Sequence, residues 1–338
     1  MALLSVRDLR VEFATSGGVV TAVDGASFDV GAGETVALLG ESGSGKSVTA
    51  QAVLGIVPKP AGRISGGTIS YDSKDLLAPG VAKGLRGREI AMVFQDPLSS
   101  LNPVFRVGAQ IGEMFRRHRG ASRREARAAA LDLMKRVGIP AASKRLDDYP
   151  HQFSGGMRQR VMIAMALACR PRLLIADEPT TALDVTVQAQ ILDLIRDLQR
   201  EFNSAVIIIT HDLGVVAELA DDIQVMYAGR AIEYGTAEDI FDRPQHPYTW
   251  GLLGAMPRID QERTERLIPI KGTPPSLINV PPGCAFNPRC NYAHLNGGAS
   301  ETEVPQLLDI GGGHQVACHL SPEQRKHAWE TDIKPKLS

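Results

Sequence analysis

The chain has 338 residues, of which 43% are hydrophobic and 22% are charged, and its formal net charge is -1. This length can bury a large core in more than one domain, and the near-neutral charge argues against general nucleic-acid binding, which favours basic chains. The first residues lack the apolar core of a signal peptide, and no apolar run approaches the ~20 residues that span a bilayer. We therefore expect a chain that is soluble or peripheral to a membrane, with its cysteines reduced.

Short apolar segments separated by glycine-rich breaks predict strands within residues 3–39. A glycine-rich loop follows at residues 40–47, and the residues after it predict a helix. Residues 89–94 form an apolar run that is typical of a buried strand. Residues 97–168 are mostly helical in pattern, with Ser122 as a candidate N-cap of one of these helices.

Strands and helices alternate beyond the helical block. LLIAD, AVIIIT and IQVMY predict strands, whereas VTVQAQILDLIRDLQREF and LGVVAELA predict helices. This alternation predicts an α/β fold with a parallel sheet, into which the helical block of about residues 97–168 is inserted as a subdomain. After about Pro244 the composition shifts to proline, glycine, histidine and cysteine with little periodicity. We therefore expect a domain of residues 1–245 and a loop-rich C-terminal extension of residues 246–338.

The loop GESGSGKS matches the pattern G-x-x-x-x-G-K-[ST] between a predicted strand and a predicted helix. Its glycines let the backbone curl so that N–H groups point at phosphate oxygens, and the helix N-terminus adds a positive end. Lys46 can neutralise the β- and γ-phosphates of ATP, and Ser47 can ligate Mg²⁺. A glycine-rich turn with a surface lysine is the alternative, which the strand–helix context disfavours. The predicted phosphate-binding residues are Gly40, Glu41, Ser42, Gly43, Ser44, Gly45, Lys46 and Ser47.

The predicted ligand set ends at Ser47. Position 48 is considered as a possible second serine after it, and we assign no binding role to that position.

The segment LLIADEPT places two adjacent carboxylates at the carboxyl end of a buried strand. We predict that Asp177 holds Mg²⁺ and that Glu178 faces the attacking water as general base or as the group that orients it. Two further polar residues, Gln95 and His211, end other predicted strands. Gln95 can contact both Mg²⁺ and the water, and His211 can bind the γ-phosphate or position Glu178. We predict Glu178, His211, Gln95 and Lys46 as the catalytic group.

The segment FSGGMRQR offers a hydroxyl and backbone N–H groups at the start of a predicted helix, which is an anion site. With the preceding motifs, and with TALD at residues 181–184, it occurs in the order seen in ATPase subunits of ABC transporters, which residues 3–240 resemble. The resemblance implies that Ser154, Gly155 and Gly156 bind the ATP held by a second subunit in a head-to-tail dimer. It also implies that Asp184 contacts that subunit and that Phe13 stacks on adenine. Phe153 and Met157 replace the leucine and glutamine of many members.

The segments FQDPLSSLNP, HPYTWGLL and PPGCAFNPRC resemble the ATP-binding subunits of bacterial dipeptide and oligopeptide importers. This resemblance implies a peripheral location on the cytoplasmic face of the cell membrane, with ATP and Mg²⁺ as cofactors. The implied partners are a related second ATPase subunit, two permease subunits and an extracytoplasmic substrate-binding protein, without nucleic acid. The alternatives are an importer of another cargo, such as nickel, an oligosaccharide or an antimicrobial peptide, and a soluble ABC ATPase outside transport.

Three cysteines, Cys284, Cys290 and Cys318, lie in the extension. The related family tail commonly has four cysteines, which in some members are thought to hold an iron–sulfur cluster, so the resemblance suggests a [4Fe-4S] cluster here. The usual next cysteine is missing, with Gly297 near its position, and such clusters normally take four thiolates. A metal held with the help of His294 or His314 and three reduced thiols without a metal both remain open.

Overall fold

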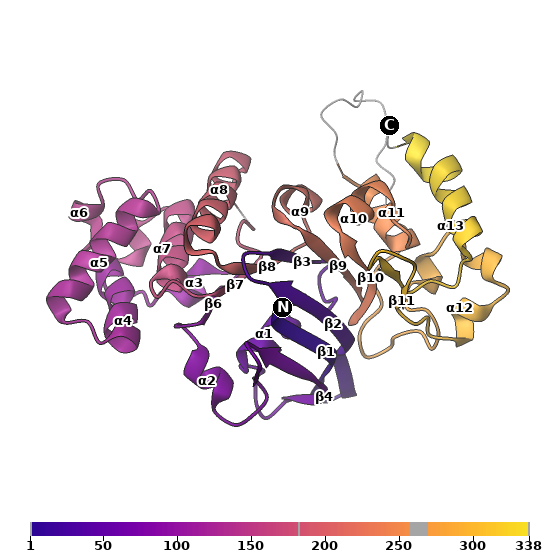
Figure 1. The fold of residues 1–338 in the computed structure, drawn as a ribbon, viewed down its shortest axis with the longest axis horizontal. Coiled ribbons are helices and arrows are strands. Elements are labelled where there is room, and N and C mark those ends of the chain that lie inside the picture. Colours follow the sequence, from indigo (N-terminus) through magenta and orange to yellow (C-terminus); the bar gives the residue numbers. More distant parts are fainter. Residues whose placement is uncertain (1, 182, 257–269, 337–338) are drawn as a thin grey trace.

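The computed structural model describes residues 2–181, 183–256 and 270–336. An antiparallel sheet with the strand order β2-β1-β4-β5 lies beside the main sheet (Figure 1). The first two strands of this smaller sheet are long, and many of their apolar residues are buried against the helix that follows the glycine-rich loop. Its strands are β1 (Ala2–Thr15), β2 (Gly18–Gly31), β4 (Gly62–Tyr71) and β5 (Lys74–Asp75).

The main sheet has eight strands in the order β11-β12-β10-β9-β3-β8-β7-β6. The run from β9 to β6 is parallel, so the carboxyl ends of its strands share one edge. All residues of β3, β7 and β8 are buried, as expected for apolar strands covered on both faces. The strands are β3 (Thr35–Leu39), β6 (Ile90–Val93), β7 (Leu173–Asp177), β8 (Ala205–Thr210), β9 (Asp222–Tyr227), β10 (Arg230–Thr236), β11 (Leu308–Asp309) and β12 (Gln315–Val316).

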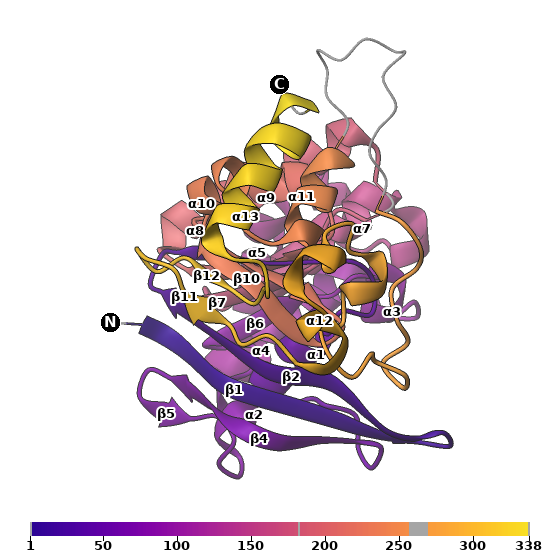
Figure 2. The same cartoon turned by 90° about the vertical axis from the view of Figure 1, so that its right-hand side faces the viewer.

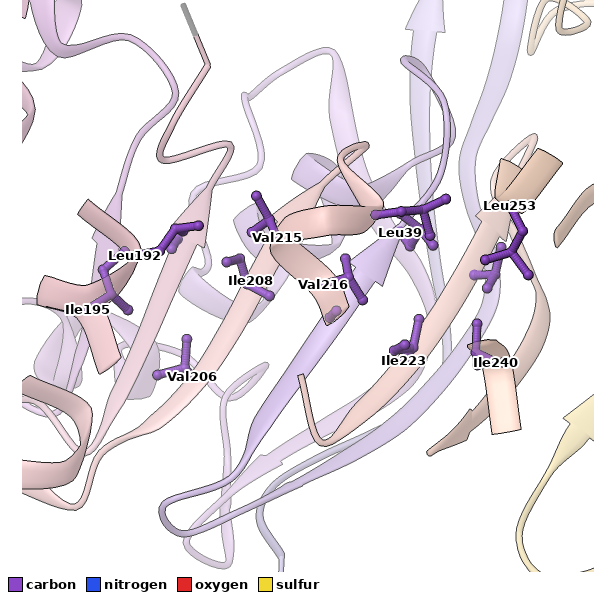
Figure 3. Packing of buried hydrophobic residues seen from close by; sticks show 14 of the residues in the cluster. Leu39, Leu192, Ile195, Val206, Ile208, Val215, Val216, Ile223, Ile240 and Leu253 are labelled. Atoms are coloured by element: carbon purple, nitrogen blue, oxygen red, sulfur yellow. The ribbon is translucent and has the colours of Figure 1, made fainter. Parts of the chain in front are cut away.

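Helices cover both faces of this sheet. One face packs against α8 (Val185–Phe202), α9 (Leu213–Leu219), α10 (Ala237–Asp242) and α11 (Pro247–Gly254), and Figure 3 shows Leu192 and Ile195 of α8 beside Val206 and Ile208 of β8. The opposite face packs against α1 (Lys46–Leu54) and the antiparallel sheet. The predicted α/β fold with a parallel sheet is therefore confirmed.

The inserted helical subdomain has its own core, which includes Ile111 and Met134. Ser122 caps one of its helices: the hydroxyl accepts from the N–H of Glu125, whose carboxylate accepts from the N–H of Ser122. This subdomain lies at one end of the molecule (Figure 1). Its helices are α3 (Pro97–Ser100), α4 (Val107–Arg119), α5 (Arg123–Arg136), α6 (Ala142–Arg145), a 3-10 turn (Pro150–Gln152) and α7 (Gly155–Leu167), and α2 (Val81–Leu85) precedes them.

The C-terminal extension is loop-rich, yet it lies against the domain that holds the main sheet (Figure 2). β12 pairs with β10, and Phe286 and Trp329 share the hydrophobic core with Trp250 of α11. A more separate appendage was expected from the sequence, because the few apolar residues of the extension show no periodicity. Its short elements are the turns Asn287–Arg289, Ala293–Asn296, Trp329–Ile333 and Lys334–Lys336, and the helices α12 (Ala299–Thr302) and α13 (Pro322–Ala328).

None of the helices in the described ranges combines the length and the apolar character needed to cross a membrane.

Candidate functional site

The glycine-rich loop leaves β3 at Gly40 and enters α1 at Lys46. Gly40 and Gly45 have φ angles of 154° and 100°, which side-chain-bearing residues rarely adopt. A Cβ atom at Gly40 would collide with the carbonyl of Met226, and one at Gly45 would collide with the carbonyl of Ala22. The backbone of the loop is therefore pressed against two strands and can take this curled form only with glycine.

Lys46 is buried inside the loop, with 5% of its surface exposed. Its Nζ atom donates to the carbonyl oxygen of Gly40 at 2.6 Å and to that of Glu41 at 2.9 Å, and it approaches the Ser44 hydroxyl at 3.3 Å. Burial lowers the pKa of Lys46, although the carboxylates of Glu178 and Asp177 act in the opposite direction. The ammonium group therefore lies inside the glycine-rich loop, where we expect the phosphate oxygens of a nucleotide to bind.

Ser47 and Asp177 join the loop to the end of β7. The Ser47 hydroxyl donates to Oδ1 of Asp177 at 3.0 Å. Burial raises the pKa of Asp177, which has 6% of its surface exposed. A hydroxyl and a carboxylate oxygen side by side are ligands that suit Mg²⁺, and a divalent cation would relieve the cost of burying this charge.

The residue at position 48 is Val48, so the expectation of a second serine after Ser47 is wrong. Val48 belongs to α1, and its partly buried side chain packs against the hydrophobic core beneath the antiparallel sheet. The helix therefore presents an apolar side chain directly after Ser47, and position 48 offers no hydroxyl to phosphate or to Mg²⁺.

Glu178 lies at the centre of a cluster of polar side chains from three strand ends. Gln95 Nε2 donates to its Oε2 at 2.8 Å, and Nδ1 of His211 lies 3.2 Å from its Oε1. The hydroxyl of Thr181 also donates to Oε2, at 2.9 Å. Glu178 has a φ angle of 45°, a backbone conformation often held at functional sites. The geometry thus gathers the three predicted residues and adds Thr181, to which no role was assigned from the sequence.

The predicted Mg²⁺ ligand Gln95 lies on Glu178 rather than on the pair Ser47 and Asp177. It follows β6, the outer strand of the parallel run, so its amide reaches the second carboxylate and not the first. Its role toward a metal ion therefore remains a prediction.

The remaining loop residues line a pocket of about 350 Å³. Glu41, Ser42, Gly43 and Ser44 form one side, and Val20, Tyr227, Ala228 and residues 274–278 complete it. Phe13 does not line this pocket: it is half-buried on β1, where a Cβ atom at Gly62 would come within 2.7 Å of its ring. Its stacking on adenine therefore stays a prediction.

Two residues of the C-terminal extension contact the loop and were not anticipated from the sequence. Both oxygens of the Glu41 carboxylate accept from the guanidinium of Arg289, at 2.6 Å and 3.1 Å. The backbone N–H of Glu41 donates to the Tyr248 hydroxyl at 2.9 Å. The segment HPYTWGLL, which contains Tyr248, resembles a family segment, but its residue spacing does not predict a contact with Glu41.

Ser154 is the N-cap of α7, where its hydroxyl accepts from the N–H of Met157 at 3.3 Å. Ser154 and Gly155 are exposed, and α7 belongs to the helical subdomain, whereas α1 lies beneath the main sheet (Figure 1). A Cβ atom at Gly156 would come within 2.7 Å of Val187, so this glycine allows α7 and α8 to approach closely. The exposed N–H groups at the start of α7 therefore belong to the helical subdomain, separate from the glycine-rich loop at the start of α1.

Asp184 caps α8, the helix that packs beside α7. Its carboxylate accepts from the N–H of Val187 at 3.0 Å, and the residue is exposed. Its contact with a second subunit remains a prediction.

The three cysteines of the extension lie close together and are partly buried. Burial raises the pKa of Cys284, raises that of Cys290 to about 11 and raises that of Cys318 to about 12. Within the part of the chain that the structure describes, no group of three histidine, cysteine or acidic side chains is arranged to hold a metal ion. His314 is engaged elsewhere, since its Nε2 lies 2.9 Å from Oε1 of Glu233.

Two family models match the chain. The ABC transporter family matches residues 23–181, which include the glycine-rich loop and Asp177. The C-terminal region of oligopeptide/dipeptide transporters matches residues 232–295, which include Tyr248 and Arg289.

Curated relatives cover nearly the whole chain. The dipeptide transport ATP-binding protein DppD of Bacillus subtilis is 51% identical over 96% of this chain and 97% of its own length. The oligopeptide transport ATP-binding protein OppD of the same organism is 54% identical over 99% of this chain and 94% of its own length. The OppD protein of Salmonella typhimurium is 55% identical over 95% of each chain.

Solved structures agree with the fold. The dimeric ATP-binding cassette MJ0796 bound to ADP and Pi is 26% identical, with a TM-score of 0.62 over 69% of this chain and 98% of its own. Clostridium perfringens cbiO1, part of an ABC transporter complex, is 30% identical, with a TM-score of 0.60 over 72% of this chain and 91% of its own. The chain therefore belongs to the ABC transporter family, among the ATP-binding subunits of dipeptide and oligopeptide transporters.

Proposed function

We propose that this chain is the ATP-hydrolysing subunit that energises import of dipeptides or oligopeptides through a membrane permease, as a peripheral protein on the cytoplasmic face. The observation that carries the proposal is the set of polar side chains at one sheet edge. Lys46 lies in the glycine-rich loop, the Ser47–Asp177 pair lies beside it, and Glu178 is held between Gln95 and His211. The peptide cargo comes from the relatives, because the site itself acts on ATP and never contacts the cargo.

Each of these residues has a separate role in the binding and hydrolysis of ATP. The backbone N–H groups of residues 40–47 and the ammonium of Lys46 bind phosphate, and Ser47 with Asp177 would hold Mg²⁺, which neutralises charge on the transferred phosphoryl group. Glu178 then accepts the proton of the attacking water. Gln95 and His211 fix the direction of this carboxylate, so movement of either strand end changes the rate of hydrolysis without removing the binding loop.

The signature segment supports a two-subunit machine. Ser154 and Gly155 are exposed, and they present a helix N-terminus that the chain's own loop does not use. We assign it to the nucleotide of a second, related ATPase subunit, with Asp184 in the same interface. A heterodimer is the form that we propose, with two permease subunits and an extracytoplasmic binding protein.

An apolar groove beside Gln95 supplies a surface for the permease. Its volume is about 250 Å³, and it lies between α1, β6 and the helical subdomain. Phe94, which lines the groove, is 42% exposed, so it adds apolar surface that a partner can cover. The groove is lined among others by Leu54, Ile56, Met92, Phe94, Met114 and Met162. A helical segment of the permease that docks here would sense the position of the Gln95 strand end.

The three cysteines fit a four-thiolate cluster only in part. They supply three thiols, but no group of three histidine, cysteine or acidic side chains in the described ranges is arranged to hold a metal ion, and burial favours the protonated thiols. A [4Fe-4S] cluster would thus need a fourth ligand from elsewhere. Anaerobic purification followed by iron and sulfide analysis tests this: about four iron atoms per chain would support the cluster, and iron-free protein would exclude it.

Reconstitution tests the proposed function. The chain is co-expressed with its permease and its second ATPase subunit, and the complex is placed in vesicles with the binding protein. We expect ATP hydrolysis to rise when peptide-loaded binding protein is added, and peptide to accumulate in the compartment that contains ATP. Stimulation by nickel or an oligosaccharide, but not by peptides, would assign another cargo. ATPase activity without any associated permease would support a role outside transport.

A further inference from the structure

Glu41 of the glycine-rich loop is held at three of its polar groups. Its carboxylate accepts two hydrogen bonds from Arg289, and its backbone N–H donates to Tyr248. Its carbonyl oxygen accepts from Nζ of Lys46 at 2.9 Å. One residue thus links the phosphate-binding lysine to the C-terminal extension, although Arg289 lies 248 positions away in sequence.

Contacts other than the one with Glu41 also hold the side chain of Arg289 in place. Its side chain is 5% exposed, and its Nε donates to the carbonyl oxygen of Lys271 at 2.8 Å. The guanidinium carbon lies 5.8 Å from the ring centre of Tyr227 and 6.0 Å from that of Phe286, so two aromatic rings flank it. A planar fork held in this way is suited to bidentate binding of a carboxylate.

The extension also forms part of the wall of the pocket at the loop. Residues 274–278 line it opposite Glu41, Ser42, Gly43 and Ser44. A ligand bound to this face of the loop would therefore contact the extension as well as the ATPase core.

The charge of Glu41 makes its partner important. A carboxylate in a phosphate-binding loop repels the phosphates of ATP, and the guanidinium of Arg289 compensates this charge through two hydrogen bonds. Removal of one partner of a mostly buried ion pair leaves the other charge uncompensated, whereas removal of both charges avoids that cost. The pair therefore links ATP affinity to the docked state of the extension.

We propose that Arg289 is a positioning residue of the ATP site, which neutralises Glu41 and holds the loop in its phosphate-binding form. This inference rests on the proposed role of residues 40–47 in binding ATP. It makes the C-terminal extension a part of the nucleotide site, so that loosening the extension weakens ATP binding even though Lys46, Asp177 and Glu178 are unchanged.

Titration of the full-length chain with a fluorescent ATP analogue tests the proposal. We expect Arg289→Met to raise the Kd by about tenfold, a usual size for coupling between two sites. Adding Glu41→Gln should restore much of the lost affinity. Tyr292→Phe is the matched control: it removes a hydrogen bond to Asp332 within the extension, leaves the pair of Arg289 and Glu41 intact, and should leave the Kd unchanged.

Each outcome decides one part of the account. A folded Arg289→Met variant with the wild-type Kd, or a raised Kd that Glu41→Gln does not restore, overturns the proposal. If Arg289→Met does not fold, Arg289→Gln takes its place, because it also removes the positive charge but keeps a hydrogen-bond donor, and an unchanged Kd in that variant overturns the proposal. If Lys46→Ala binds the analogue as well as the wild type does, the assignment of the loop as the ATP site fails instead.

Discussion

The hydroxyl of Ser47 donates a hydrogen bond to Oδ1 of Asp177 at 3.0 Å, across 130 positions of sequence. This contact ties the first turn of α1 to the carboxyl end of β7, so the two groups expected to hold Mg²⁺ are already adjacent. Asp177 is buried there, and its burial disfavours the charged form.

The first prediction concerns Asp177 in the nucleotide-free protein. Because the pKa of Asp177 is raised by burial, its contribution to stability is present at acidic pH and is lost as the pH rises through the folded-state pKa. Asp177→Asn should therefore raise the melting temperature at pH 7.5 in the absence of nucleotide, while ATP hydrolysis is lost. Thermal unfolding and a phosphate-release assay measure the two effects.

The exposed Asp242, whose substitution by Asn should change neither property, is the control for this experiment. A lower melting temperature for Asp177→Asn at pH 7.5 would show that the buried carboxylate stabilises the protein.

The second prediction concerns Lys46. Its ammonium group is the only side-chain cation that the glycine-rich loop carries, and loop carbonyls hold it in place. Lys46→Ala should therefore abolish measurable ATP binding at concentrations near the wild-type Kd, since the charge of the β- and γ-phosphates is then unopposed. Equilibrium titration with labelled ATP checks this, and binding within a factor of about two of the wild type would contradict it.

The third prediction concerns His211. Its Nδ1 lies 3.2 Å from Glu178 and the side chain is mostly exposed, so the residue acts on the carboxylate and contributes little to the core. His211→Ala should lower kcat by roughly 100-fold, the lower range for general-base catalysis, with little change in ATP affinity. Steady-state kinetics separate the two quantities. A raised KM with normal kcat would assign His211 to substrate binding instead.

The parts of the fold that were predicted share one property. β3, β7 and β8 are unbroken apolar runs followed by a polar residue or a glycine, so their burial and their ends could be located from residue types alone. β4 was missed because glycines at 62, 66 and 67 interrupt it, and β10 was missed because it carries Arg230 and Glu233. These strands form because neighbouring strands supply hydrogen bonds, which the sequence of the segment does not reveal.

The candidate site also contains contacts that the sequence predicts and contacts that it does not. Glu178, Gln95 and His211 follow parallel strands, and parallel strands bring their carboxyl ends to one edge, so their meeting could be predicted. The contact of Arg289 with Glu41 could not be predicted from the sequence, because it depends on how an irregular segment packs against the core.

The fourth prediction concerns stability where the extension meets the core. Glu233 on β10 is fully buried, and it accepts hydrogen bonds from the hydroxyl of Thr249 at 2.5 Å and from the N–H of His246 at 3.1 Å. Thr249→Val should lower the free energy of unfolding by roughly 1.5–3 kcal/mol, as expected for a hydrogen bond to a charged group. Thr331→Val, at an exposed threonine, is the control in urea unfolding, and equal effects of the two changes would contradict the importance of Glu233.

The most direct test of the account is the behaviour of Glu178→Gln. The amide keeps the shape of the carboxylate and its contacts with Gln95 and Thr181, but it cannot accept the proton of the attacking water. With ATP and Mg²⁺ and its second subunit, this variant should bind ATP, elute as a stable ATP-containing dimer in size-exclusion chromatography and show no measurable hydrolysis. Hydrolysis near the wild-type rate, with ATP bound, would contradict the assignment of Glu178 as the general base.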